Sequence, residues 1–144
     1  MTRARRAVLV ACGAACGGGA RWVLVGLVPI AAGAAWLAPA LLLCVNASGS
    51  FLAGFIRALC GRERSRAADH AAIDAFLVAG FCGGYTSYSG FVAFSLPGDG
   101  HSVGAAVGIA AATVVLCPLA ALAGMRVGGG YPAKPPRAPQ DPTP

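Results

Sequence analysis

The stretch that decides the fold runs from residue 80 to residue 91 and reads Gly80-Phe81-Cys82-Gly83-Gly84-Tyr85-Thr86-Ser87-Tyr88-Ser89-Gly90-Phe91. It lies inside a longer apolar segment, yet it holds four glycines and, besides Tyr85, four hydroxylated residues. An unbroken helix is unfavourable here because glycine has a low helix propensity. A break at membrane depth is tolerated where freed carbonyls line a cavity, coordinate an ion or face protein. We therefore predict a helix broken in mid-membrane, with a purely structural kink as the alternative.

The composition of the whole chain supports a membrane setting. Of 144 residues, 57% are apolar and 11% are charged, and the mean hydropathy is +0.70. Soluble domains carry about 25% charged residues, so this chain has too few polar groups to cover a water-exposed surface. These values exclude an ordinary soluble enzyme and a disordered protein. They predict an all-α integral membrane protein.

Four apolar segments are long enough to cross a bilayer, which takes about 20 residues each. They span residues 7–28, 35–59, 71–96 and 103–127. Alanine and glycine are frequent in all four, which predicts a tightly packed bundle. Residues 1–130 thus form one membrane domain, and the proline-rich segment 131–144 is expected to be a disordered cytoplasmic tail.

The basic residues are distributed unevenly along the chain. Ten of the eleven precede the first span, surround the loop after the second, or close and follow the fourth, whereas the loops 29–34 and 97–102 contain none. Positive residues accumulate on the cytoplasmic side of membrane proteins. We therefore expect both termini in the cytoplasm and no nucleic-acid partner, despite the net charge of +6. The remaining basic residue, Arg21, lies inside the first span.

Three polar residues inside the spans are candidates for function. Arg21 either snorkels to the outer interface or supplies a fixed positive charge near an anion path. Asn46 shares a helical face with Gly49 and Ser50, so it either forms an interhelical hydrogen bond or donates N–H to a passing anion. Thr113, taken alone, is expected to bond to the carbonyl four residues earlier in its own helix.

The sequence shows no arrangement of residues that is typical of a catalytic site. Six cysteines are spread through the spans without a Cys-x-x-Cys pair, and His70 and His101 are isolated in sequence. There is no Ser/His/Asp set, phosphate loop or pair of carboxylates. We therefore do not expect an enzyme.

Three segments together resemble the CrcB/Fluc family of small fluoride channels. They are Gly17-Gly18-Gly19-Ala20-Arg21-Trp22, Asn46-Ala47-Ser48-Gly49-Ser50-Phe51-Leu52-Ala53-Gly54, and the segment 80–91. The resemblance implies a multi-pass subunit of the bacterial plasma membrane that forms an antiparallel dimer with two narrow pores. Each pore lets fluoride leave the cytoplasm passively, so the implied partners are fluoride, lipid and a second subunit.

The resemblance also implies roles for individual pore residues. Asn46 would donate a hydrogen bond to fluoride, and Tyr88 and Phe91 would turn their ring edges towards the ion. Ser89 would lie between the two rings on a track of hydroxyl groups. Thr113 would match a threonine of the fourth span.

Two further roles concern positive charge. Gly83 and Thr86 would offer backbone carbonyls at the break to a structural sodium ion at the dimer centre, which would make the protein metal-binding. Arg21 would match an arginine that the family carries in its first span.

The segment 80–91 departs from the family pattern at several positions. Tyr88 stands where phenylalanine is expected, and Ser87 and Gly90 replace threonines. After Phe91, the apolar residues Val92-Ala93-Phe94 replace a more polar sequence. Part of the polar track is therefore missing, and one of the two pores is expected to be poor or closed.

The charge distribution predicts the kind of partner. A homodimer of inverted copies needs a chain that inserts both ways, but a ten-to-zero bias orients nearly all copies alike. We therefore expect a heterodimer with a homologous subunit of opposite topology. The alternatives are a small multidrug-resistance-type exporter, which would need a carboxylate that the first span lacks, and a non-conducting subunit of a heterodimeric fluoride channel.

Overall fold

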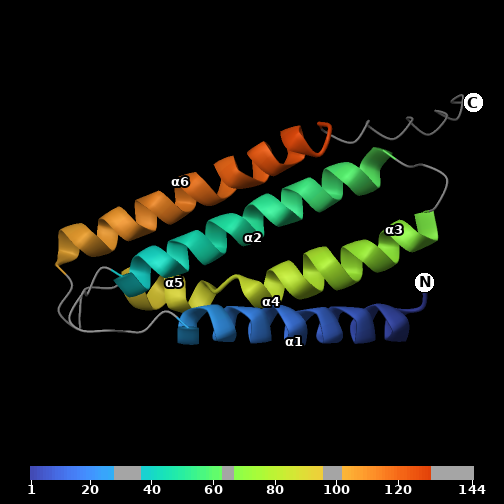
Figure 1. The fold of residues 1–144 in the computed structure, drawn as a ribbon, viewed down its shortest axis with the longest axis horizontal. Coiled ribbons are helices and arrows are strands. Elements are labelled where there is room, and N and C mark those ends of the chain that lie inside the picture. The colour runs from blue at the N-terminus through green and yellow to red at the C-terminus, as the bar shows by residue number, and fades with distance from the viewer. Residues whose placement is uncertain (28–36, 63–66, 96–101, 131–144) are drawn as a thin grey trace, which may run out of the picture.

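The computed structural model describes residues 1–27, 37–62, 67–95 and 102–130. All regular structure in these residues is helical, and four segments lie side by side, each running opposite to the one before it in the chain (Figure 1). They are α1 (Arg3–Leu27), α2 (Leu37–Arg62), a third crossing over residues 67–95, and α6 (Val103–Val127). The bounds of α6 match the prediction, and those of α1 and α2 differ from it by one to four residues. The predicted tail 131–144 lies outside the described residues.

The third crossing is divided into four pieces. They are α3 (Ala67–Ile73), the π-helix η2 (Asp74–Cys82), α4 (Gly83–Tyr85) and α5 (Tyr88–Ser95). The first three pieces follow one another directly, and Thr86 and Ser87 separate them from α5. The break predicted within segment 80–91 is thereby confirmed. Within the described residues, three helices are long and apolar enough to span a membrane, over Arg3–Val25, Leu37–Gly61 and Val103–Val127.

The four segments form a row rather than a closed square (Figure 1). α1 packs against η2 and α4, η2 also contacts α2, and α2 packs along α6. After the break, α5 contacts both α6 and α2. The break thus lies where the third crossing leaves its contact with α1 and meets the pair formed by α2 and α6.

Glycines bring the helix backbones into direct contact. Gly13 and Gly17 of α1 face Gly80 and Gly84 of the third crossing, and a Cβ atom at Gly17 would overlap the backbone of Phe81. Gly54 of α2 and Gly124 of α6 lie equally close to the backbone of the opposite helix, at Ala121 and Phe51 respectively. Small residues permit such close approach in membrane bundles, so the predicted tight packing is confirmed.

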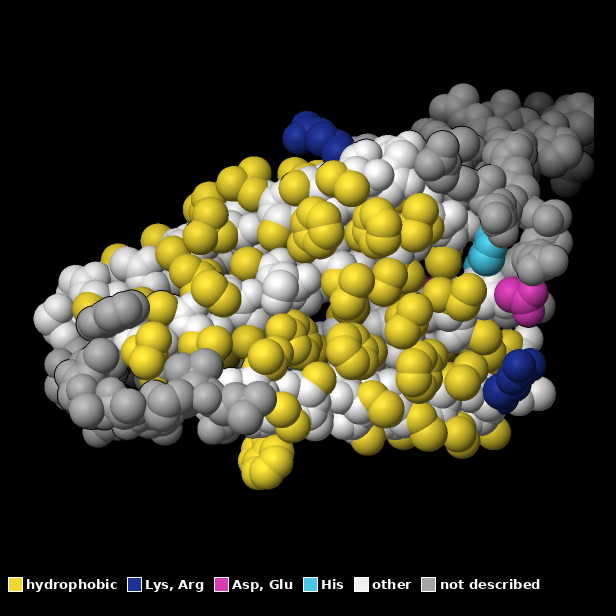
Figure 2. Space-filling model, in the orientation of Figure 1, with side chains coloured by type: hydrophobic (Ala, Val, Ile, Leu, Met, Phe, Trp, Pro, Cys, Tyr) yellow, Lys and Arg dark blue, Asp and Glu magenta, His cyan; other side chains and the backbone are white. Residues whose placement is uncertain are grey.

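Large apolar side chains point outwards. The buried apolar residues of the described part are few and mostly small: Val45, Ile56, Ala58, Ala75, Cys82 and Ala106. By contrast, Trp22 is 77% exposed and Leu119 is 53% exposed. Figure 2 shows apolar side chains over most of one face, with the few charged groups in view at its rim. Such a surface suits hydrocarbon, and with the three apolar helices it identifies a membrane protein.

The described basic residues other than Arg21 gather at one end of the bundle. Arg3, Arg5 and Arg6 begin α1, Arg57 and Arg62 close α2, and Arg126 closes α6. The start of α1 and the ends of α2 and α6 lie at the same end because the segments alternate in direction (Figure 1). Near it, Arg57 Nε pairs with Asp74 Oδ1 at 3.3 Å, in an exposed ion pair between α2 and η2 that contributes about 0–1 kcal/mol.

Candidate functional site

The break consists of Thr86 and Ser87. Thr86 is extended, with φ −73° and ψ 156°, and its N–H and hydroxyl donate to the carbonyl of Cys82 at 3.0 and 2.9 Å. Ser87 caps α5, because its Oγ accepts from the N–H of Gly90 at 3.1 Å and its carbonyl accepts from the N–H of Phe91 at 3.2 Å. Serine is a favoured residue at helix N-termini. The Thr-Ser pair therefore ends one helix and begins the next.

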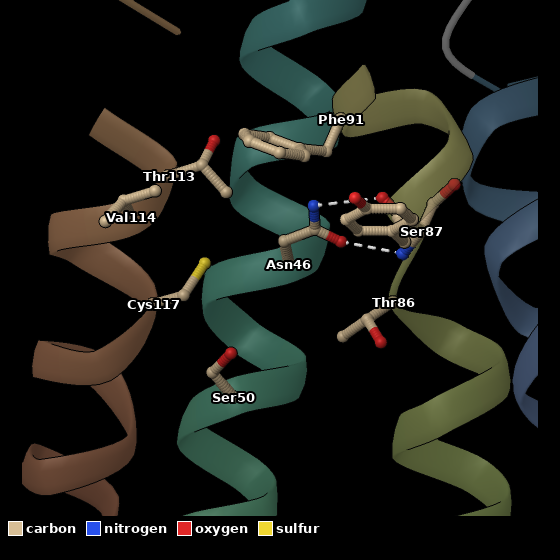
Figure 3. Close-up of a pocket in the computed structure, with 9 residues that line it drawn as sticks. Asn46, Ser50, Thr86, Ser87, Phe91, Thr113, Val114 and Cys117 are labelled. Carbon is tan, nitrogen blue, oxygen red and sulfur yellow. Dashed lines mark hydrogen bonds between the residues drawn. The ribbon is translucent and has the colours of Figure 1, made fainter. Parts of the chain in front are cut away.

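Asn46 of α2 binds the backbone of Ser87 through both ends of its carboxamide (Figure 3). Oδ1 accepts from the Ser87 N–H at 2.8 Å, and Nδ2 donates to the Ser87 carbonyl at 3.4 Å. Asn46 and Ser87 are each only 7% exposed, and an unpaired buried amide would cost about 1–3 kcal/mol. The interhelical hydrogen bond, one of the two interpretations of Asn46, is therefore present. It uses one of the two Nδ2 hydrogens.

Arg21 of α1 reaches the same break from another helix. Its Nη1 donates to the carbonyl oxygen of Thr86 at 3.4 Å, in a partly buried position. Two consecutive residues of the break are thus held from different helices, Thr86 by Arg21 and Ser87 by Asn46. The guanidinium stands at the break, as the interpretation of a fixed positive charge requires.

An open groove of about 300 Å³ runs beside the break between α2, α5 and α6. Its lining residues are Asn46, Ser50, Thr86, Ser87, Tyr88, Phe91, Thr113, Val114 and Cys117. Figure 3 shows them converging from the three elements onto one space. The rings of Tyr88 and Phe91 have centroids 5.9 Å apart and planes inclined by 38°, and Tyr88 is 79% exposed.

The groove brings together four of the predicted pore residues. Asn46, Tyr88, Phe91 and Thr113 all line it. Ser89 does not line it, but its Oγ lies 3.4 Å from the Oγ of Ser87.

Of the remaining predicted residues, Arg21 and Gly83 also stand apart from the groove lining. Arg21 contacts the break from α1, and Gly83 is exposed at the start of α4. Of the two residues predicted to hold sodium, Thr86 alone lines the groove.

Thr113 forms the local bond expected of an isolated threonine in a membrane helix. Its Oγ1 donates to the carbonyl of Ile109 at 2.9 Å. The hydroxyl proton is therefore used within α6, and what Thr113 presents to a neighbour is an oxygen that can accept a hydrogen bond.

Three polar residues of the groove, Ser50, Ser87 and Cys117, were not among the predicted pore residues, although Ser50 was placed on the same helical face as Asn46. Ser50 lies one helical turn after Asn46, and Cys117 lies one turn after Thr113, so each pair shares a helix face. That spacing was the available signal, but serine and cysteine are also ordinary packing residues in membrane helices. A hydroxyl pair was missed as well: Ser48 Oγ lies 3.3 Å from the hydroxyl of Tyr85.

Of the two carbonyls predicted to bind sodium, that of Thr86 fits a cation poorly, because it already accepts from the guanidinium of Arg21. Gly83 is exposed. Among the described residues, no group of three His, Cys, Asp or Glu side chains could hold a metal ion. The sodium ion implied by the resemblance stays a prediction.

Comparisons with known proteins support the family that the sequence segments resemble. The family model described as "CrcB-like protein, Camphor Resistance (CrcB)" matches residues 8–125. Fluoride-specific ion channel FluC 1 of Rhodopseudomonas palustris (strain BisB18) is 36% identical over 109 residues, which cover 74% of this chain and 75% of that protein. Fluoride-specific ion channel FluC of Methylocella silvestris is 36% identical over 110 residues, covering 75% and 81%. No solved structure matches the chain.

These matches decide two of the predictions made from sequence. The relatives are named as ion channels, so the prediction that the chain is not an enzyme is confirmed. The family model covers most of the chain and includes α2, the break and nearly all of α6. The chain belongs to the CrcB family of fluoride channels that its three sequence segments resemble.

Proposed function

We propose that this chain is a subunit of a fluoride-selective channel that lets cytoplasmic fluoride leave passively and thereby lowers fluoride toxicity. Two relatives named as fluoride-specific ion channels support the substrate. The proposed path is the groove beside the break. An exporter of the multidrug-resistance type finds no support in these relatives.

One observation carries the proposal: beside the groove, Asn46 binds the backbone of the break at Ser87. The break gives the third crossing a helix N-terminus at α5, inside the bundle. Helix N-termini carry a partial positive charge, and broken membrane helices direct such ends at anions. With Ser87 O accepting from Asn46 and from the N–H of Phe91, the capped end of α5 is fixed in place.

The groove also offers suitable groups for a small, strongly hydrated anion. A selective pore must replace the water shell with donors, yet bind weakly enough for release. The second Nδ2 hydrogen of Asn46 and the positively polarised ring edges of Tyr88 and Phe91 are such groups. All three residues line the groove.

One departure from the family pattern has a packing explanation. A Cβ atom at Gly90 would come within 2.9 Å of Leu42 Cδ1 and within 3.1 Å of Ser87 Oγ. A threonine there would therefore require Leu42 and the cap of α5 to move. Gly90 fits the contact between α5 and α2 without such a movement.

The channel is proposed to lie in the bacterial plasma membrane with both termini in the cytoplasm. The support is the set of basic residues at one end of the bundle, according to the positive-inside rule. The inside-negative membrane potential then drives an anion outwards at about 2.3 kcal/mol per charge and 100 mV. Passive exit therefore needs no other energy source.

A second subunit is proposed to close the groove, in an antiparallel dimer. The groove of one subunit is open along one side, whereas a selective pore must enclose a dehydrated ion. Because the bias of ten basic residues to none orients the chain one way, we propose a homologous partner of opposite topology rather than an inverted copy.

Fluoride transport is tested with the complex that purifies through a tag on this chain. Liposomes containing the complex are loaded with fluoride, and efflux is followed with a fluoride electrode while valinomycin and potassium hold the voltage. We expect fluoride efflux well above that of empty liposomes and well above chloride efflux. Equal efflux from protein-containing and empty liposomes would contradict the proposed function.

The heterodimer is tested separately from transport. A fluorescent reporter that folds only in the cytoplasm is fused to the C-terminus, and the fraction of copies that fluoresce is compared with total protein. Nearly all copies should fluoresce, and the chain reconstituted alone should transport poorly. Equal populations in both orientations, or robust fluoride efflux from the chain alone, would contradict the proposed heterodimer.

A non-conducting subunit remains the second candidate because part of the polar track is missing. In that case the complex would transport fluoride, but Asn46→Asp in this chain would leave the rate unchanged. A groove that conducts would lose transport with the same substitution.

A further inference from the structure

The carbonyl of Thr86 loses its helical partner at the break. In a continuous helix it would accept from the N–H of residue 90, but that N–H donates to the Ser87 side chain instead, at 3.1 Å. A buried carbonyl without a partner is costly in a membrane. The group that satisfies it is the guanidinium of Arg21, through Nη1 at 3.4 Å.

Among the residues that the structure describes, no carboxylate forms an ion pair with Arg21. The two acidic residues in the described part, Asp69 and Asp74, precede Thr86 by at least twelve residues along the third crossing. Asp74 is paired with Arg57 near the end of α2. The guanidinium of arginine is positively charged, so the break carries a positive charge beside its partly buried carbonyl.

A second cation bound to the carbonyl oxygen of Thr86 would be repelled by the positive charge of Arg21. Two unit charges about 4 Å apart in an environment of effective dielectric constant near 20 repel each other enough to weaken binding about a thousandfold. A sodium ion on Thr86 O would lie close enough to the guanidinium for this repulsion to approach that size, because Nη1 itself is 3.4 Å from the same oxygen.

We propose that the guanidinium of Arg21 is the resident cation of the break in this chain, so that its fold does not depend on bound sodium. Arg21 is a positioning residue: it stabilises the extended Thr86 and, through it, the orientation of α5 beside the groove. The proposal concerns the stability of the break and does not depend on fluoride transport.

The test is thermal unfolding of the purified complex in detergent, in sodium chloride and in choline chloride. Wild-type protein should melt at the same temperature in both salts. Arg21→Gln should melt several degrees lower in choline chloride and recover in sodium chloride, because the vacated carbonyl becomes available to the ion. Arg21→Lys should behave like the wild type. Arg126→Gln, which removes the same charge at the exposed end of α6, is the matched control and should be insensitive to the salt.

Two results would overturn the proposal. The first is a saturable rise in the melting temperature of the wild type with sodium, which requires no variant and therefore stands even if Arg21→Gln does not fold. The second is an Arg21→Gln protein with wild-type melting temperatures in both salts, since Arg21 would then not be holding the break.

Discussion

Two regions of the molecule differ in the residues that lie between their helices. Between α1 and the third crossing, Gly13, Gly17, Gly80 and Gly84 bring two backbones into contact and leave no space. Beside the break, α2, α5 and α6 separate around an open groove of about 300 Å³ that is lined by Asn46, Tyr88 and other polar or aromatic groups. The two regions adjoin through Thr86, which lines the groove and accepts from Arg21 of α1.

The difference teaches what a glycine-rich sequence can and cannot specify. Small residues permit close approach wherever they align on facing helices. A groove forms where a polar side chain interrupts that packing and binds backbone that has left its helix, as Asn46 does with Ser87. The contact region should therefore control folding, and the groove should control transport.

The largest effect is expected from Gly17→Val in the contact region. A Cβ atom there would overlap the backbone of Phe81, which cannot move without separating α1 from the third crossing. Overpacking typically costs about 1–3 kcal/mol and more where backbone must shift, so we expect little monodisperse protein by size-exclusion chromatography. Gly19→Val is the matched control, since nothing lies within 4 Å of that position. Normal yield of Gly17→Val would disprove the close contact.

The next-largest effect is expected on fluoride transport. Asn46→Asp keeps an acceptor for the Ser87 N–H but places a negative charge in the groove, and like charges at such distances repel by about 1–4 kcal/mol. Fluoride efflux should fall by about tenfold to a thousandfold. Ser48→Ala, on the same helix but outside the groove lining, should leave efflux within about twofold. A wild-type rate for Asn46→Asp would remove Asn46 from the fluoride path.

A smaller loss is expected when an aromatic ring is replaced by an aliphatic group. Phe91→Leu retains apolar volume but removes the polarised ring edge, an interaction of about 0.5–1.5 kcal/mol. Efflux should fall by up to about tenfold, with the melting temperature nearly unchanged. Tyr88→Phe, which restores the residue expected from the family, should preserve or raise the rate. Faster efflux from Phe91→Leu would argue that the ring obstructs the path.

The smallest effect is expected at Thr113. Its hydroxyl proton is already donated to Ile109 O, so Thr113→Val removes an acceptor but no available donor. Efflux in the reconstituted complex should change by no more than about twofold, because anions need donors. A tenfold loss would show that the hydroxyl turns towards fluoride during transport.

Much of the fold could be predicted because membrane insertion imposes simple rules. The apolar lengths gave the spans, and the glycines and hydroxyl groups of segment 80–91 gave the break. The π-helix η2 could not be predicted, because a change from α- to π-helical winding alters hydrogen bonds without a distinctive composition. In this part of the third crossing, Gly80 and Gly84 contact α1. That contact depends on both helices and cannot be predicted from the composition of one of them.

Residues of the candidate site could be predicted where a polar side chain lies within an apolar span. Asn46 and Arg21 stood out as polar groups in apolar spans, and both hold the break. Ser50 and Cys117 did not stand out, because such residues commonly pack between helices. The hydrogen bond between Arg21 and Thr86 could not be predicted from the sequence either, because it depends on how α1 lies against α4.

The central claim, that the groove beside the break is the fluoride path, is tested most directly through Cys117. Mercuric ion binds thiolates tightly, and Cys117 lines the groove, whereas Cys16 of α1 lies outside it. Fluoride efflux from the reconstituted complex is measured before and after addition of mercuric chloride. We expect at least about tenfold inhibition in the wild type and in Cys16→Ser, and none in Cys117→Ser. Equal inhibition of Cys117→Ser and the wild type, or no inhibition of the wild type, would contradict the claim.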